Sequence, residues 1–233
     1  MLRKIDHRQM GKSNQGWLQS IFHFSFAEYY NPENINFGVL RVINDDQIAP
    51  GTGFGTHPHR DMEIISYVVD GTLTHADSMG NQRAVSRGHI QYMSAGTGVL
   101  HSEHNRTTDP LRMLQIWIFP DKQGYTPNYG DFLFDWEERQ NNWLHMVSNK
   151  SGNAPVKINQ DVNFYSLELE KGKEIDFPVS PGRQAYLVQI EGKSTINDLS
   201  LEARDALETV EESIEIKADE TSHFLVIEMQ KEA

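Results

Sequence analysis

Short hydrophobic segments separated by glycine- and aspartate-rich turns recur along the chain, and few of them have the spacing of an amphipathic helix. Residues 63–69 (EIISYVV) are rich in β-branched side chains, and the Asp70-Gly71 pair that follows is typical of a hairpin turn. Residues 72–76 are predicted to form the returning strand, and 111–119 (LRMLQIWIF) form the longest apolar strand candidate. Strands at such short spacing predict a β-barrel or a β-sandwich.

This pattern breaks after Pro120 and then resumes. Residues 121–142 contain glycine, proline and a polar stretch ending in two asparagines, which is typical of a connection between domains. Only residues 201–210 (LEARDALETV) have a composition that predicts a helix. Further strands are predicted at 17–26, 39–43, 89–93, 144–148, 163–169, 184–190, 195–197, 213–216 and 224–229. We therefore expect an all-β chain with two barrels in tandem, formed by residues 1–130 and 131–233.

Composition narrows the class of protein. With 233 residues, 38% of them hydrophobic, the chain can bury a sizeable core, and it contains no cysteine for a disulfide, a thiolate metal site or a thiol nucleophile. The charged N-terminal residues and the lack of a long apolar run predict neither a signal peptide nor a membrane partner, so we expect a cytoplasmic protein. The net charge is −12, and 17 acidic against 7 basic residues lie from Asp161 onward, which disfavours direct binding to nucleic acid.

Candidate chemistry lies in two glycine-rich stretches, GTGFGTHPHRDME and SAGTGVLHSEHN. Each carries two candidate metal ligands at positions i and i+2, namely His57 with His59, and His101 with Glu103. Alternate side chains share one face of a strand, so two neighbouring antiparallel strands would direct all four ligands toward one cation. A single histidine is more often a surface or hydrogen-bonded residue, but two such pairs are hard to obtain by chance.

The other histidines of this region are not expected to bind the metal. His104 has the wrong parity to share a face with the second pair, and His75 and His89 have no paired ligand. Asn105 does share that face and is a candidate to support the ligands by hydrogen bonding.

The donor set limits the metal. Three imidazoles and one carboxylate, without a thiolate, favour iron, manganese, nickel, copper or zinc over calcium or magnesium. Four protein ligands leave two open positions on an octahedral ion, and the residual positive charge favours an anionic ligand such as an enolate. A redox-active metal in such a site suits oxygen insertion, whereas a redox-inert one would act as a Lewis acid.

Both stretches resemble cupin motifs, and in detail they resemble those of the pirin family. The hallmark stretches of that family match HPHRDME (57–63) and AGTGVLHSE (95–103), and the segments GWLQSIFHFSFAEYYNP and LRVINDD are similar to bacterial pirin-like proteins. The chain departs from the general cupin pattern at Gly71, which comes one residue late, and at Ser94, which stands where a proline is usual. These departures match pirins.

The resemblance implies two tandem cupin (double-stranded β-helix, jelly-roll) barrels with one metal in the N-terminal barrel. It implies that the metal ligands are His57, His59, His101 and Glu103, and that Glu63 supports them instead of binding the metal. The expected cofactor is one divalent transition metal, with iron first and manganese, nickel, copper, cobalt or zinc as alternatives.

The second barrel is expected to hold no metal. The resemblance implies this, and the sequence agrees, since the two late histidines, His145 and His223, lie far apart with no HxH pair.

The resemblance also implies an oxidoreductase of the quercetin 2,3-dioxygenase type, in which a flavonol and O2 react at the metal and carbon monoxide is released. Glu103 is then the candidate catalytic base that accepts the proton of the substrate hydroxyl. Two alternatives stay open because fold does not fix function: a non-enzymatic metal-containing regulator that binds a protein partner, and a cupin enzyme acting on a different enol. Phe54, Tyr67, Tyr92 and Trp117 could line a pocket for a flat substrate, although aromatic strand residues usually belong to the core.

Overall fold

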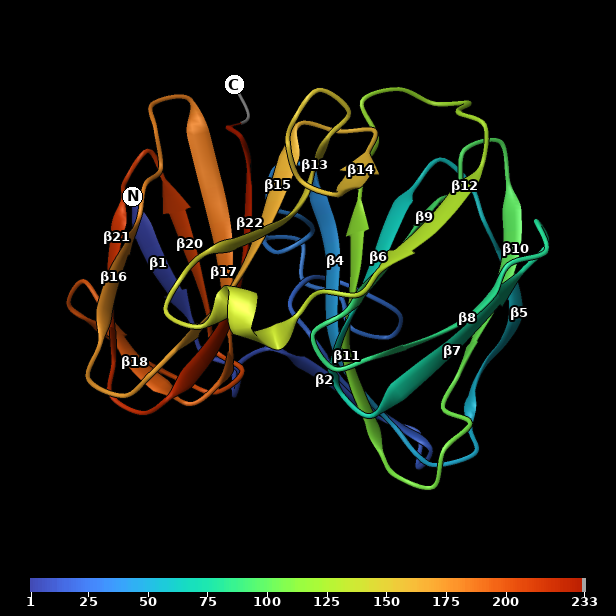
Figure 1. Ribbon diagram of the computed structural model, residues 1–233, viewed down its shortest axis with the longest axis horizontal. Helices are drawn as coiled ribbons and strands as arrows, with labels where there is room; N and C mark the ends of the chain where they lie inside the picture. The colour runs from blue at the N-terminus through green and yellow to red at the C-terminus, as the bar shows by residue number, and fades with distance from the viewer. Residues whose placement is uncertain (232–233) are drawn as a thin grey trace. The chain divides into compact units, whose positions relative to one another are not determined.

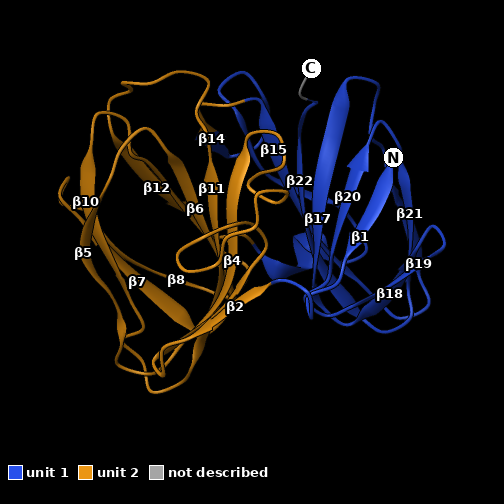
Figure 2. Cartoon of the chain, turned by 180° about the vertical axis from the view of Figure 1, so that it is seen from behind, with its two compact units in different colours: residues 1–10, 135–157, 161–233 blue, residues 11–134, 158–160 orange. Residues whose placement is uncertain are grey.

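Strands make up almost all of the regular structure (Figure 1). The computed structural model describes residues 1–231, and within them the one helical segment is the 3₁₀ turn η1 (Trp136–Arg139). The described residues contain no helix with the length and apolar character that a membrane crossing requires. The strands form four antiparallel sheets, which belong to two compact units (Figure 2).

The unit that contains the predicted metal ligands, coloured orange and labelled unit 2 in Figure 2, is called the first unit, and the blue one the second. The first unit contains a seven-stranded and a four-stranded sheet. The strand orders are β12-β9-β6-β11-β4-β3-β2 and β5-β10-β7-β8. The strands are β2 (Gly11–Asn14), β3 (Leu18–Phe22), β4 (Leu40–Ile48), β5 (Gly53–His59), β6 (Glu63–Asp70), β7 (Thr72–Asp77), β8 (Gln82–Ser86), β9 (Ile90–Ser94), β10 (Val99–His104), β11 (Leu111–Ile118) and β12 (Asn128–Phe132). Buried side chains of both sheets, such as Val68 and Met113 from one and Leu73 and Val85 from the other, form one hydrophobic cluster between them.

The second unit repeats this arrangement with sheet orders β1-β20-β17-β22-β15-β13-β14 and β16-β21-β18-β19. The strands are β1 (Leu2–Ile5), β13 (Leu144–Asn149), β14 (Val156–Ile158), β15 (Val162–Leu169), β16 (Glu174–Phe177), β17 (Arg183–Glu191), β18 (Lys193–Ile196), β19 (Leu199–Glu202), β20 (Ala206–Val210), β21 (Ile214–Ala218) and β22 (Ser222–Gln230). A continuous core that includes Leu187, Ile196, Ile216 and Phe224 joins its two sheets. The all-β prediction is confirmed.

The helix predicted at residues 201–210 is wrong. The segment forms the end of β19, a turn and β20, and Arg204 in the turn has a φ of +76°. The composition favours a helix, but β20 is held on both sides by β17 and β1 and buries Ala206 and Leu207. Pairing and burial therefore override local propensity.

The unit boundaries also differ from the predicted division at residue 130. Residues 1–10 group with the second unit because β1 pairs with β20, and residues 158–160 group with the first unit (Figure 2). The segment 121–142 is not a plain connection, since β12 within it pairs with β9. Gly130 permits that pairing, because a Cβ there would lie 2.4 Å from the ring of Tyr92.

Candidate metal centre

Three of the four predicted ligands converge through the pairing of β5 with β10. The two strands are antiparallel, and His57 lies directly opposite His101. The ring centroids of His57 and His59 are 4.8 Å apart, and each lies within 4.9 Å of the His101 ring. The spacing argument from the sequence is therefore realised for the three histidines, whose ligand nitrogens all lie within 4.8 Å of one another.

The ring nitrogens of these histidines are arranged as a metal requires. His57 Nε2 lies 3.0 Å from His101 Nε2, close to the separation of two adjacent ligands that are each about 2.1 Å from one ion. His57 Nδ1 lies 2.8 Å from the carbonyl oxygen of Gly55, to which it can donate, and this leaves Nε2 free as a ligand. Burial, reinforced by the neighbouring rings, lowers the pKa of His59 to about 4 and that of His101 to about 3. Both rings are therefore neutral at neutral pH, with lone pairs available to a cation.

A close approach of the two strands sets the position of Glu103. A Cβ at Gly53 would lie 2.3 Å from the backbone oxygen of Glu103, so only glycine fits there. The register between the strands shifts between His101 and Glu103, which then pairs with Phe54. Such an irregularity redirects a side chain relative to a regular ladder.

The Glu103 carboxylate is buried and held by three neutral donors. Ser66 Oγ donates to Oε1 at 2.8 Å, Gln91 Nε2 donates to Oε1 at 2.5 Å, and Gln115 Nε2 donates to Oε2 at 2.5 Å. These contacts fix the orientation of the carboxylate without neutralising it. A carboxylate oxygen of Glu103 lies within 4.8 Å of ring nitrogens of His101 and His75, so Glu103 adjoins the histidine cluster through their shared member His101.

His75, which the sequence argument set aside, lies at this centre. It is fully buried on β7, opposite Glu103, and its ring is 5.4 Å from that of His101 and stacked on Tyr129 at 4.4 Å. Its Nε2 lies 3.0 Å from Asp77 Oδ2, and its Nδ1 has no hydrogen-bond partner among the described residues. The signal that could have revealed it is His75 with Asp77, an i, i+2 pair on a strand next to β10.

A cavity of about 440 Å³ opens onto the centre from the interior of the first unit. Its wall includes His57, His59 and Glu103. Its apolar and aromatic part is formed by Trp17, Leu18, Phe22, Phe26, Phe54 and Trp117. Trp117 packs edge-on against His59 with ring centroids 4.9 Å apart. Of the four aromatics considered from the sequence, Phe54 and Trp117 line the cavity, whereas Tyr67 is fully buried and Tyr92 accepts a hydrogen bond from Asn128.

Glu63 and Asn105 stabilise the surroundings of the site without contacting the predicted ligands. Glu63 is buried, and its carboxylate accepts hydrogen bonds from Ser94 Oγ and from the backbone and side chain of Asn159. Asn105 bonds to the carbonyl oxygens of Ile48 and Asp109, so it orders the loop after β10. Neither is among the residues whose ligand atoms cluster at the centre.

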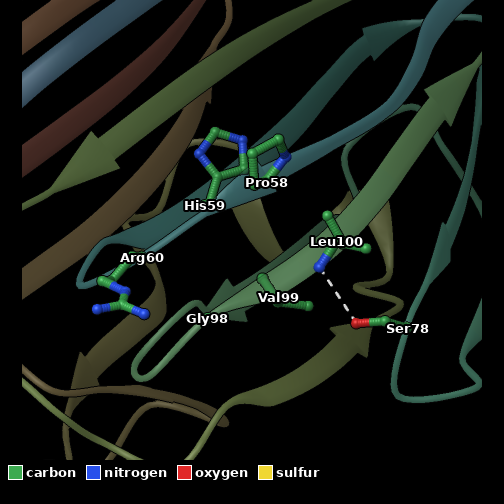
Figure 3. A pocket seen from close by; sticks show the side chains of 7 residues that line it. All are labelled: Pro58, His59, Arg60, Ser78, Gly98, Val99 and Leu100. Carbon is green, nitrogen blue, oxygen red and sulfur yellow. Dashed lines mark hydrogen bonds between the residues drawn. The ribbon is translucent and has the colours of Figure 1, made fainter.

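The outer side of β5 and β10 carries a shallow, open depression (Figure 3). Pro58, Val99 and Leu100 line it, and the backbone nitrogen of Leu100 donates to Ser78 Oγ at 3.1 Å. In Figure 3 the His59 ring and the Arg60 side chain point away from each other. The depression is therefore a surface feature of β5 and β10, and the less open space beside the predicted ligands is the interior cavity.

In the second unit, Asp6, His7 and Asp205 also lie within 4.8 Å of one another. Cations already hold these carboxylates, since Lys4 Nζ lies 2.9 Å from Asp205 and an Arg8 nitrogen lies 2.6 Å from Asp6. This cluster is an ion-pair network that joins the N-terminal segment to β20. The absence of a metal from the second barrel stays a prediction.

The histidine cluster and Glu103 suit a divalent transition metal. Neutral imidazoles at the observed separations and a buried carboxylate form a nitrogen-rich set of intermediate hardness, with the cavity on one side for further ligands. The Nδ1 atom of His101 is buried without a hydrogen-bond partner among the described residues.

Comparison with known proteins agrees with this fold. Residues 4–118 match the family model described as Pirin, and residues 145–229 match that described as Quercetinase C-terminal cupin domain. The chain is 41% identical to a quercetin 2,3-dioxygenase of Escherichia coli K12, across 98% of this chain and 97% of that one. It is similar to the crystal structure of YhhW from Escherichia coli, with a TM-score of 0.95, 39% identity and coverage of 100% and 99% of the two chains. It is also similar to bacterial pirin YhhW in complex with nickel(II), with a TM-score of 0.93, 38% identity and full coverage of both chains.

Proposed function

The chain belongs to the pirin family, with its bicupin fold, and from that premise we propose that it is a metal-dependent dioxygenase that opens the heterocyclic ring of a flavonol and releases carbon monoxide. The E. coli relative carries the name of this activity, and a related pirin structure holds nickel(II). These relatives support a divalent metal and dioxygenase chemistry for the family.

The cavity is the observation that carries the proposal. Its volume of about 440 Å³ falls in the range of small-molecule sites, roughly 300–1,000 Å³. Its aromatic walls suit a flat, polycyclic substrate, and the same space is bordered by His57, His59 and Glu103. A flavonol bound there would have its rings against apolar side chains and a hydroxyl directed at the metal ligands.

His57, His59, His101 and Glu103 would hold the metal. When bound, a divalent transition metal would supply Lewis acidity and a redox-capable centre for the enolate and O2. The chain itself would orient the flavonol between aromatic side chains and exclude water from the reacting ring. Flavonol and O2 together give a ring-opened ester and carbon monoxide, so the reaction balances without a further reductant.

Glu103 is the proposed base for the substrate hydroxyl. Its carboxylate borders the cavity and is kept in one orientation by Ser66, Gln91 and Gln115. Proton acceptance by a positioned carboxylate requires it to lie within hydrogen-bond reach of the hydroxyl, and a rigid orientation favours that geometry. The base role rests on this position and is secondary to the ligand role.

The test is turnover of quercetin by protein loaded in turn with iron and with nickel. Under air, the loaded protein should consume oxygen, bleach the flavonol absorbance and release carbon monoxide, and a His101→Ala variant should lose both metal and activity. Fully metallated protein that neither consumes oxygen nor releases carbon monoxide contradicts the proposal. Oxygen uptake with a different enol only would keep the cupin chemistry and overturn the substrate, and redox-dependent binding of a protein partner would favour the regulator.

A further inference from the structure

A row of buried polar side chains crosses the inner face of the seven-stranded sheet of the first unit. Asn44 on β4 lies opposite Gln115 on β11, Gln115 lies opposite Ser66 on β6, and Ser66 lies opposite Gln91 on β9. These four strands are neighbours in the sheet (Figure 1). Three members of the row donate hydrogen bonds to Glu103, and Asn44 is the one that does not.

Asn44 lines the cavity, and its amide oxygen is buried without a partner among the described residues. Its side chain is only 4% exposed, and its Oδ1 has no hydrogen-bond partner among residues 1–231. A buried polar atom without a partner is unfavourable and uncommon in folded proteins, so its position in a cavity wall indicates a partner from outside the chain. A ligand hydroxyl is a suitable partner, because it can donate to the amide oxygen or accept from the amide nitrogen.

Asp46 and Ser20 extend this polar feature along the wall. Asp46 follows Asn44 by two residues on β4, so both side chains face the cavity, and it is 2% exposed. Ser20 Oγ donates to Asp46 Oδ1 at 2.5 Å, while the intervening Asp45 is paired with Arg112. No cation pairs with Asp46 among the described residues, and burial raises its pKa to about 7.

We propose that Asn44, Asp46 and Ser20 form a second polar subsite that binds a hydroxyl group of the aromatic substrate, one strand beyond the Gln115 contact to Glu103. The subsite rests on the proposed function, because it assumes a flavonol whose enol hydroxyl is directed at the metal ligands. It adds a determinant of specificity: a flavonol that carries hydroxyls on its outer rings should bind more tightly than one that carries the enol hydroxyl alone. The apolar side chains of the wall cannot make that distinction.

The test compares two flavonols in the absence of oxygen, so that binding is measured without turnover. Quercetin carries outer-ring hydroxyls and 3-hydroxyflavone does not, while both keep the enol. Dissociation constants are measured by quenching of tryptophan fluorescence in nickel-loaded protein, with the metal content of each sample recorded. Wild type should prefer quercetin by about 10-fold, the order of one buried hydrogen bond.

Asn44→Leu keeps the approximate volume of the side chain and removes its polar atoms, so it should abolish this preference without changing the affinity for 3-hydroxyflavone or the nickel content. Gln47→Leu is the matched control, since Gln47 is on the same strand and faces away from the cavity. It should keep the wild-type preference. Ser20→Ala, a smaller change, should reduce the preference and serves as the second variant if Asn44→Leu does not fold.

The two proposals fail in different ways. If wild type releases carbon monoxide from quercetin and folded Asn44→Leu, or Ser20→Ala in its place, keeps the full preference, the subsite is wrong and the proposed function stands. If nickel-loaded wild type binds neither flavonol, the proposed function fails and the subsite fails with it.

Discussion

At the scale of single residues, Glu103 shows how the sheet orients a predicted ligand. Its carboxylate oxygens are held by side chains from three different strands. All three donors are neutral, so none is a cation that would compete with the metal for the carboxylate. Hydrogen bonds of this kind hold a ligand in one orientation. The spacing in the sequence could indicate the candidate ligands, which occur as pairs on one strand. It could not predict their donors, since Ser66, Gln91 and Gln115 each stand alone in the sequence and meet only through the strand order.

We therefore expect Gln115→Leu to weaken metal binding by about 10- to 100-fold while the fold is retained. The substitution removes the hydrogen bond to Glu103 Oε2 and leaves the histidines unchanged. Calorimetric titration with nickel measures the affinity of each variant. Gln47→Leu, on the outer side of β4, is the control. Unchanged nickel affinity in the Gln115 variant would show that Glu103 does not depend on this donor.

The buried Asp46 leads to a prediction about how stability depends on pH. Burial raises its pKa from 3.8 in the unfolded chain to about 7 in the folded protein, so the folded state holds the proton more tightly. Its contribution to stability is complete below about pH 4, decreases as the pH rises, and is lost above pH 7, a change of roughly 4 kcal/mol. Asp46→Asn, which cannot ionise, should lose this dependence.

The measurement is urea denaturation of the metal-free protein at pH 5 and pH 8. The difference between wild type and Asp46→Asn cancels the other titrating groups, including the buried His23, whose pKa burial lowers to about 4. From pH 5 to pH 8 wild type should lose stability relative to the variant. A constant difference would show that the carboxyl does not titrate in this range.

At the scale of strands, local pattern predicted the elements well and their pairing poorly. The predicted strands 63–69 and 111–119 match β6 and β11 to within one residue at their ends, because hydrophobic β-branched runs favour strands. The helix prediction for 201–210 failed because the strand that forms there depends on pairing with β17 and with β1, and β1 is distant in sequence. The strand at 128–132 was missed because its polar residues pair with β9 at the edge of the sheet.

The close contact of β5 with β10 at Gly53 can be tested by substitution. Gly53→Ala would place a methyl group 2.3 Å from the Glu103 backbone oxygen and 2.5 Å from His104 Cα, so the strands must separate. We expect a lower melting temperature and at least a 10-fold loss of nickel affinity, since His57 and His101 are held together by this pairing. Gly55→Ala is the matched control, because no atom lies within 4 Å of a Cβ there. Equal effects of the two substitutions would contradict this explanation.

At the scale of the whole chain, the first and the last strand, β1 and β22, belong to the same sheet of the second unit. The N-terminal strand β1 closes the edge of the second unit by pairing with β20, although the residues that follow it build the first unit. Arg3 forms a two-pronged ion pair with the buried Glu208, and Lys4 and His7 both contact Asp205. No pattern within residues 1–10 indicates this return, because the partner strand lies some 200 positions away.

This return predicts that the N-terminal segment stabilises the second barrel and is dispensable for the metal centre. Removal of residues 2–10 should expose the edge of β20 and leave Glu208 buried without its cation, which is a destabilising combination. Hydrogen exchange should accelerate in β20 and β17, while nickel binding at the His57, His59 and His101 cluster remains within about 3-fold of wild type.

Two substitutions separate the ion pair from the strand. Arg3→Ala removes the cation from Glu208, whose side chain is 4% exposed, and should cost about 2–3 kcal/mol because a buried carboxylate loses its partner. Arg8→Ala removes an ion pair that is exposed and local, and should leave the stability close to that of wild type. If the truncated protein keeps the wild-type exchange rates in β20, pairing with β1 does not protect that edge. The second barrel is then stable without the N-terminal strand.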